Sequence, residues 1–164
     1  MRAEIGPDGL LVLAGQRFRC AIGKRGVREH KEEGDSATPE GVLPLRRVLY
    51  RADRMRAPDC VLPIEPIGRD DGWCDDPDDK SYNRMVLLPY AARHEELWRT
   101  DGLYDIVGVL GWNDAPVVRK AGSAIFLHVA TQDYAPTEGC VALALPDLLR
   151  VLAMGLTEIL VVPA

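Results

Sequence analysis

Three features that would assign a chain of 164 residues to a class at once are missing from this sequence. It has no excess of positive charge, since 20 Lys and Arg face 25 Asp and Glu and the net charge is −5. It has no apolar run near the roughly 18–20 residues that cross a bilayer. It also has no Cys-x-x-Cys pair. These absences argue against a nucleic-acid-binding protein, a membrane span and a structural zinc site. We therefore predict no metal and no cofactor.

The sequence also indicates neither a disulfide framework nor a signal peptide. With 47% hydrophobic residues, a chain of this length can build an apolar core without a disulfide framework. The first seven residues lack the apolar segment and cleavage pattern of a signal peptide. We expect a single domain over residues 1–164, and the sequence leaves the oligomeric state open. The four cysteines are Cys20, Cys60, Cys74 and Cys140.

What the chain does have is frequent turn residues, with 15 Gly and 12 Pro between short apolar runs. This pattern is typical of β-rich proteins. Residues 10–14 and 17–22 flank Gly15-Gln16 and predict a hairpin. Further strands are expected at residues 42–50, 84–88, 104–110, 124–130, 140–144 and 157–162.

One segment has a helical pattern. Pro146 suits a first helical turn, an apolar face follows, and Gly155 suits the C-terminal cap. Residues 57–83 are rich in Pro, Asp and Gly and are expected to form a long loop. The predicted fold is mainly β, a sandwich or barrel-like sheet with one or two short α-helices.

A histidine and a cysteine stand out because of the segments that carry them. His128 lies in an apolar run, where strand alternation places Phe126, His128 and Ala130 on one face. After a polar loop, Gly139 precedes Cys140, and a glycine there allows a sharp turn. An imidazole near a thiol can take its proton and generate a nucleophilic thiolate. The spacing is that of a Cys/His acyl-transfer site.

This segment resembles the YkuD-type L,D-transpeptidase catalytic domain, whose signature is a histidine, a loop, then Ser/Thr-His-Gly-Cys and a strand of small residues. The matching positions are His128, Thr137, Gly139 and Cys140. Upstream, residues 34–41 resemble the Thr-Pro-x-Gly turn of the same family. The chain departs from the family pattern at three positions. Glu138 replaces a histidine, Ala142 replaces an arginine or asparagine, and Val129 replaces a glycine.

The resemblance implies a YkuD-like fold and a bacterial cell-wall enzyme that acts on peptidoglycan stem peptides. Cys140 would form a thioester, His128 would act as base, and Gly139 with Cys140 would supply oxyanion N–H groups. Amine attack would give a 3→3 cross-link, whereas water would make the enzyme an L,D-carboxypeptidase. Carbapenem-type inhibitors are expected to acylate the cysteine. The family implies a location in the periplasm or cell envelope. Because no signal peptide is seen in the sequence, a cytoplasmic location also stays open.

Four further residues are candidate substrate contacts. By resemblance, Thr137 orients the site or touches substrate, and Glu138 is either solvated or binds a substrate amino group. Trp73 either covers the core or belongs to a loop over the cleft, and Arg84 would then bind a carboxylate in place of Ala142.

A rival interpretation is a non-catalytic wall-binding module that keeps the fold. A catalytic Cys140 is expected to alkylate faster at neutral pH than the other cysteines, whereas an inert one would not.

Overall fold

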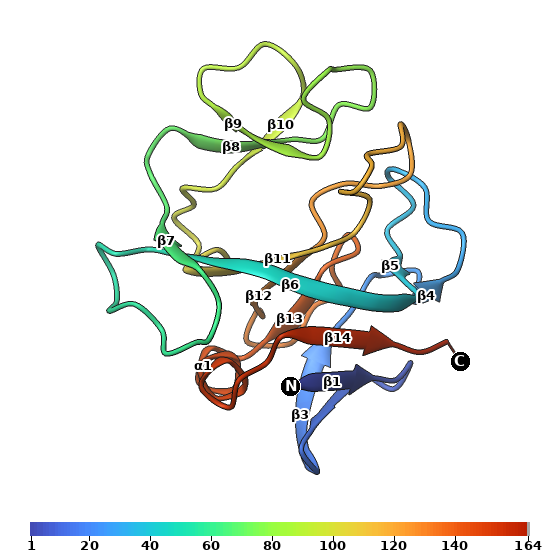
Figure 1. The fold of residues 1–164 in the computed structure, drawn as a ribbon, viewed down its shortest axis with the longest axis vertical. Coiled ribbons are helices and arrows are strands. Elements are labelled where there is room, and N and C mark those ends of the chain that lie inside the picture. Colours follow the sequence, from blue (N-terminus) through green and yellow to red (C-terminus); the bar gives the residue numbers. More distant parts are fainter. Residues whose placement is uncertain (164) are drawn as a thin grey trace.

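The computed structural model describes residues 1–163, and fourteen strands and one helix lie within that range. Their order along the chain can be followed in Figure 1. The elements are β1 (Arg2–Ile5), β2 (Leu10–Leu13), β3 (Gln16–Ala21), β4 (Val27–Arg28), β5 (Thr38–Pro39), β6 (Gly41–Tyr50), β7 (Ile64–Pro66), β8 (Asp71–Cys74), β9 (Arg84–Leu87), β10 (His94–Glu96), β11 (Ile106–Leu110), β12 (Phe126–Val129), β13 (Val141–Leu143), α1 (Leu145–Ala153) and β14 (Glu158–Val161).

Eight strands close into a ring, and the long strand β6 makes the closure. The sheet runs β11-β12-β13-β3-β2-β1-β14-β6, and β11 pairs back onto β6. The first residues of β6 pair with β14, while residues 45–50 pair with β11. A strand of ten residues is long enough to serve both neighbours. The barrel-like, mainly β fold predicted from the sequence is therefore confirmed.

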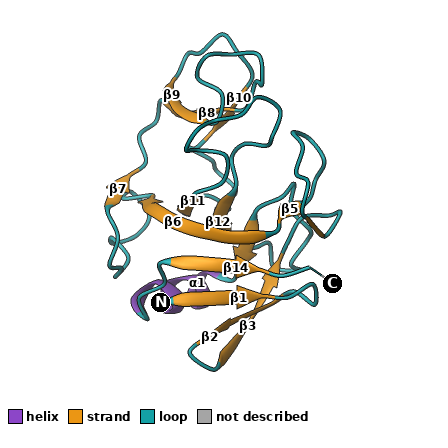
Figure 2. Cartoon of the chain, turned by 45° about the vertical axis from the view of Figure 1, so that its right-hand side comes forward, coloured by secondary structure: helices purple, strands orange, loops and turns teal. Residues whose placement is uncertain are grey.

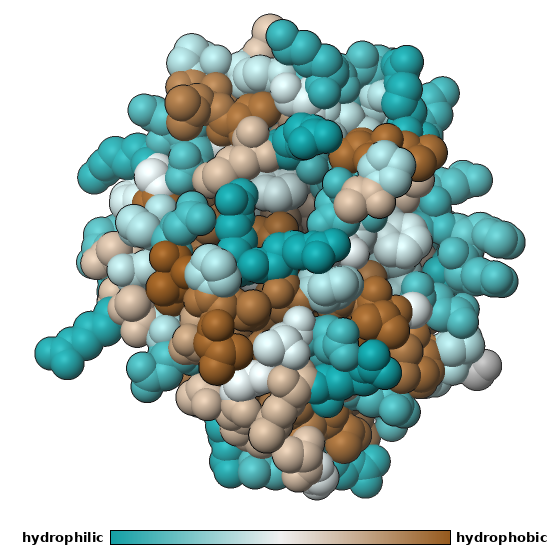
Figure 3. Space-filling view, viewed as in Figure 1, coloured by the Kyte–Doolittle hydropathy of each residue, from teal (hydrophilic) through white to brown (hydrophobic). Residues whose placement is uncertain are grey.

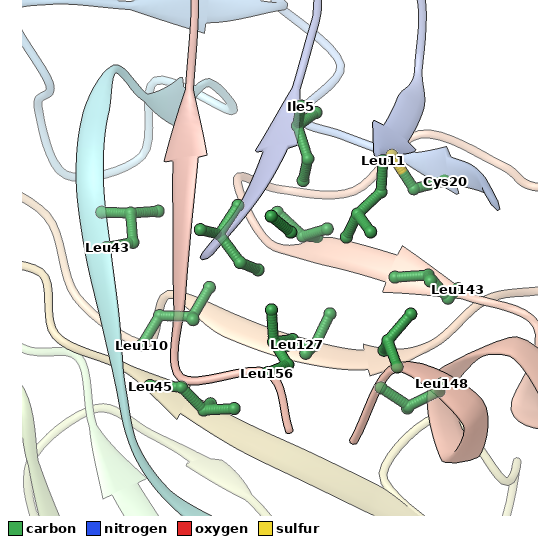
Figure 4. Packing of buried hydrophobic residues seen from close by; sticks show 14 of the residues in the cluster. Ile5, Leu11, Cys20, Leu43, Leu45, Leu110, Leu127, Leu143, Leu148 and Leu156 are labelled. Atoms are coloured by element: carbon green, nitrogen blue, oxygen red, sulfur yellow. The ribbon is translucent and has the colours of Figure 1, made fainter. Parts of the chain in front are cut away.

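The inside of the ring holds the larger apolar core. Alternating residues of each strand point inward, as in β1, where Ala3 and Ile5 are fully buried and their neighbours are exposed. Leu127 and Leu143 enter from β12 and β13. Figure 4 shows these side chains meeting Leu148 of the helix. Burial of apolar surface on this scale is the main stabilising contribution to the fold.

Helix α1 covers one end of this core. Pro146 stands in its first turn, and Leu148, Val151 and Leu152 form its buried face. Gly155 follows the helix with φ +89°, a conformation that suits glycine. These findings confirm the predicted helix. Figure 2 shows it as the one purple element, at the end of the molecule away from β8, β9 and β10.

A smaller sheet, in the order β10-β8-β9, lies at the top of Figure 1. A second apolar cluster contains Trp73 from this sheet together with Phe126, Val107 and Cys140 from the ring. Trp73 packs edge-on against Phe126, with ring centroids 5.1 Å apart. The outward-facing side chains of β11 and β12 are thus covered, and this covered face carries the candidate site.

The structure corrects the loop predicted at residues 57–83, because that segment contains β7 and β8. Its aspartates accept backbone hydrogen bonds at the turns, as Asp71 does from Gly68 N at 2.6 Å and Asp79 from Ser81 N at 2.7 Å. The turn chemistry was visible in the sequence, but the strand between the turns was not. The predicted hairpin of residues 10–22 is confirmed by the pairing of β2 with β3.

The outer surface mixes polar and apolar groups, as the face in Figure 3 shows. The large apolar side chains that are more than half exposed are scattered along the described chain at Met1, Val61, Leu87 and Val118. No helix within residues 1–163 is both long enough and apolar enough to cross a membrane.

Candidate active site

His128 and the start of the cysteine strand lie side by side on parallel strands. β12 pairs with β13 in parallel, with Leu127 opposite Val141 and His128 opposite Ala142. Leu127 points into the ring core, whereas Phe126 belongs to the outer cluster that also contains Cys140. The alternation predicted for this strand is therefore confirmed. It brings the imidazole and the thiol to the same face of the ring.

Both side chains line one cavity of about 240 Å³. Its wall is formed by the end of β12, the turn before β13, and residues 95–104 of the segment that follows β8 and β9. The lining residues that matter for chemistry are His128, Cys140, Thr137, Glu138, Tyr104 and Glu95. A nucleophile, a base and two carboxylates thus border one cavity.

The Cys140 thiol is buried and hydrogen-bonded to the backbone. Its Sγ donates to the Ala124 carbonyl at 3.2 Å and accepts from the Phe126 N–H at 3.4 Å. Burial, reinforced by the negative charge of Glu95, raises the pKa of the Cys140 thiol to about 12. In this arrangement the cysteine is a neutral thiol. The raised pKa argues against the fast alkylation at neutral pH that we expect of a catalytic Cys140 from the sequence, and that expectation stays a prediction.

His128 is held in one tautomer. Its Nδ1 lies 2.9 Å from the Val129 carbonyl oxygen, and since a carbonyl only accepts, Nδ1 carries the proton. Nε2 is then free to act as a base. Burial lowers the pKa of His128, so the ring is neutral at neutral pH. The Tyr104 ring packs edge-on against it at 5.4 Å and fixes its plane.

The turn before the cysteine is held by one hydroxyl. Thr137 Oγ1 donates to the Cys140 carbonyl at 2.6 Å and accepts from the Gly139 N–H at 3.1 Å. Gly139 has φ +136°, which L side chains rarely adopt. A Cβ at Gly139 would lie 2.8 Å from the Ala37 carbonyl oxygen. Only glycine therefore fits this turn.

The upstream motif packs against the same turn. Ala37 and Thr38 are fully buried, and Thr38 Oγ1 accepts a 2.8 Å hydrogen bond from the Gly23 N–H. Ser36 Oγ donates to Glu138 Oε2 at 2.7 Å. Residues 34–41 therefore support the cysteine turn from behind, which explains why the two motifs occur together in this chain.

The structure does not bring Trp73 and Arg84 to the cavity of Cys140. Both line a separate cavity of about 380 Å³, together with Met85 and Trp112. The Trp73 indole N–H donates to Asn83 at 3.0 Å, and its ring covers Phe126. Trp73 thus covers the core, the first of its two predicted roles. Arg84 is exposed on β9, and the arginine that lines the Cys140 cavity is Arg99.

Glu95, Arg99 and Tyr104 are three site residues that no motif in the sequence singled out. Tyr104 Oη donates to Glu95 Oε2 at 2.9 Å, and the Arg99 guanidinium lies 5.1 Å from the Tyr104 ring centre. Glu95 reaches the site because β10 pairs with β8, where Glu95 lies opposite Trp73. This long-range pairing has no local sequence signal. Among residues 1–163, no three His, Cys, Asp or Glu side chains form a group that could hold a metal ion.

A family model described as the L,D-transpeptidase catalytic domain, YkuD, matches residues 9–161 of the chain. The matched range includes the cysteine turn, His128 and the supporting motif at residues 34–41. A search of curated proteins found no match.

Proposed function

Because this chain belongs to the family of L,D-transpeptidase catalytic domains, which act on peptidoglycan, we propose that it transfers acyl groups between peptidoglycan stem peptides through a thioester on Cys140. The donor is a stem tetrapeptide, and the product is a 3→3 cross-link. The substrate places its site of action in the bacterial cell envelope.

The observation that carries this proposal is the shared cavity. Cys140 and His128 both border it, and Arg99, Thr137 and Glu138 add polar groups to its wall. His128 has its free Nε2 because Nδ1 is bound to the Val129 carbonyl. Because burial keeps the imidazole neutral at neutral pH, its unprotonated Nε2 is available to accept a proton.

Acylation begins when the bound donor displaces the thiol from the Ala124 carbonyl. The thiol proton passes to His128 Nε2, and Sγ attacks the carbonyl carbon of the third residue. The C–N bond to the terminal D-Ala then breaks, and the leaving amine takes the proton from His128. The sequence leads us to expect oxyanion N–H groups from both Gly139 and Cys140. Because the Gly139 N–H already donates to Thr137, we assign the oxyanion to the Cys140 N–H alone.

The terminal carboxylate of the donor needs a cation, and we assign Arg99 to it. Arg99 lines the Cys140 cavity, whereas Arg84 lines the other one. Thr137 holds the turn, and Glu138 stands at the rim, bound to Ser36. We propose that Thr137 and Glu138 also contact the substrate.

The test is mass spectrometry of a disaccharide-tetrapeptide mixture incubated with wild-type protein, Cys140→Ala and His128→Gln. The wild type is expected to release D-Ala and form a covalent adduct on Cys140, and both variants are expected to lose release. Cys20→Ala is the matched control, because Cys20 is also buried with a pKa raised to about 12 but lies outside the cavity. A carbapenem serves as a second acyl donor to Cys140.

The products separate the remaining alternatives. A cross-linked dimer supports transpeptidation, and a tripeptide alone supports the L,D-carboxypeptidase. An unchanged mixture with folded wild-type protein and no carbapenem adduct would contradict acyl transfer and favour a wall-binding module.

A further inference from the structure

Glu95 is a carboxylate that the steps above leave unused. It extends from β10 into the cavity of Cys140. Burial raises its pKa, and its charge in turn raises the pKa of the Cys140 thiol. An acid this close to a nucleophilic cysteine opposes thiolate formation. Because Glu95 disfavours the thiolate during acylation, we expect its role to lie in the second step, the attack of the acceptor on the thioester.

One oxygen of Glu95 is occupied and the other is free. Oε2 accepts the hydrogen bond from the Tyr104 hydroxyl, which orients the carboxylate. For Oε1, no hydrogen-bond partner occurs within residues 1–163. Every fully buried polar side-chain atom in that range has a partner. Oε1 is therefore not fully buried, and Glu95 borders both the cavity of Cys140 and a second cavity of about 340 Å³ that also involves Trp98 and Asp101.

Glu95 also has no cationic side chain paired with it. The ion pairs of residues 1–163 do not include it, and Arg99, whose positive charge acts to lower the pKa of Glu95, pairs with Asp101. A buried carboxylate is strongly stabilised by a cation placed against it, because the surroundings screen the attraction poorly. Glu138, the other carboxylate of the cavity, is exposed and bound to Ser36. Glu95 is thus the better partner for a positively charged group.

We propose that Glu95 binds the ammonium group of the amine acceptor and takes its proton as the amine attacks the thioester. This role rests on the proposed function and names the acceptor class: a primary amine that arrives protonated. Tyr104 is the positioning residue, since it leaves Oε1 as the oxygen that meets the ammonium.

The step balances as follows. One ammonium proton passes to Glu95, and the freed nitrogen lone pair attacks the thioester carbon. A C–N bond forms, the C–S bond breaks, and Cys140 leaves as thiolate. His128 takes the second nitrogen proton and gives it to the thiolate. Glu95 then releases its proton to solvent, and the thiol is restored.

The experiment compares a cationic acceptor with a neutral one. The Cys140 thioester is formed from disaccharide-tetrapeptide, then offered Nα-acetyl-lysine amide or hydroxylamine, which is mostly uncharged at neutral pH. Glu95→Gln is expected to lower the ratio of amide to hydroxamate about 100-fold, the usual scale for loss of a general base. Acylation itself should persist. Glu96→Gln, the exposed neighbour on β10, is the matched control and should keep the wild-type ratio.

A second readout does not depend on the chemistry. Binding of Nα-acetyl-lysine amide to Cys140→Ala protein, followed by NMR, should weaken at least tenfold when Glu95→Gln is added. An unchanged ratio and unchanged binding in Glu95→Gln, with acylation intact, would overturn the role of Glu95. A loss seen in Glu138→Gln instead would assign the ammonium to the rim. Absence of any thioester in the wild type would count against the proposed function, while the binding readout would still decide on Glu95.

Discussion

The thiol of Cys140 donates a hydrogen bond to the carbonyl oxygen of Ala124 across 3.2 Å. Ala124 adopts φ +53°, which turns the chain just before β12. The nucleophile is thus held against the backbone as a neutral thiol, beside His128 in the same cavity but bound elsewhere. Catalysis then requires the bound substrate to break the hydrogen bond from Cys140 to Ala124, so that the thiol can transfer its proton to His128.

This arrangement predicts that Cys140 alkylates slowly at neutral pH. The half-buried Cys60 should react with iodoacetamide first, because it is the most accessible of the four cysteines. Below a pKa of about 12 the Cys140 rate should rise about tenfold per pH unit, in proportion to its thiolate fraction. Peptide mass mapping over time gives each rate. Rapid labelling of Cys140 at neutral pH would mean that the thiol is already paired with His128.

The raised thiol pKa also predicts a loss of stability in alkali. The folded-state pKa of Cys140 is about 12 and its unfolded value is near 9.0. Its contribution is fully present below about pH 9 and is lost as the pH rises toward 12. At about pH 10.5 the loss is about 2 kcal/mol, from 1.36 kcal/mol per pH unit.

Urea unfolding of wild type and Cys140→Ala measures this loss. The variant lacks the titrating group, so its deficit at about pH 8 should shrink by about 2 kcal/mol at about pH 10.5. A deficit that stays constant with pH would contradict the raised pKa.

Local patterns in the sequence predicted the ring better than they predicted the site. The β2–β3 hairpin and helix α1 have their turn and cap residues adjacent in the chain, so local chemistry suffices. Alternation in β12 likewise placed Phe126 and His128 on one face. The hairpin, the helix and this strand could therefore be predicted from residues within each element.

The opposite wall of the cavity carries no such signal. Glu95 reaches the cavity through the pairing of β10 with β8, and β8 itself lies in a stretch that resembles a loop. The same pairing explains Arg84. It lies on β9, on the other side of β8 from β10, and so faces a different cavity.

The two arginines give a direct prediction. Arg99→Gln should lower kcat/KM for the tetrapeptide donor roughly 10-fold to 100-fold, the scale of one charge-assisted hydrogen bond. Arg84→Gln should leave it within about twofold, as expected for an exposed residue outside the site. Steady-state release of D-Ala measures both. A larger effect at Arg84 would restore it as the carboxylate contact.

Thr137 provides a test of the cysteine turn. Thr137→Val keeps the shape but leaves the Gly139 N–H and the Cys140 carbonyl without their shared partner. We expect a loss of about 1–3 kcal/mol in the free energy of unfolding and a lower acylation rate. Thr137→Ser keeps the hydroxyl and should retain most of both. A loss in Thr137→Ser without a loss in Thr137→Val would show that the methyl group, and not the hydroxyl, holds the turn.

Gly139 should tolerate no side chain. In Gly139→Ala the new Cβ would lie 2.8 Å from the Ala37 carbonyl oxygen, at φ +136°. Strain of this kind costs about 3 kcal/mol, and relief of the contact would displace Cys140 from the cavity. Gly15→Ala is the matched control. Its φ is +77° with nothing within 4 Å, so it carries backbone strain alone and should cost about 1 kcal/mol. Thermal unfolding and D-Ala release are measured for both variants. If Gly139→Ala lost no more stability than Gly15→Ala and kept its activity, the contact with Ala37 would have no part in placing the nucleophile.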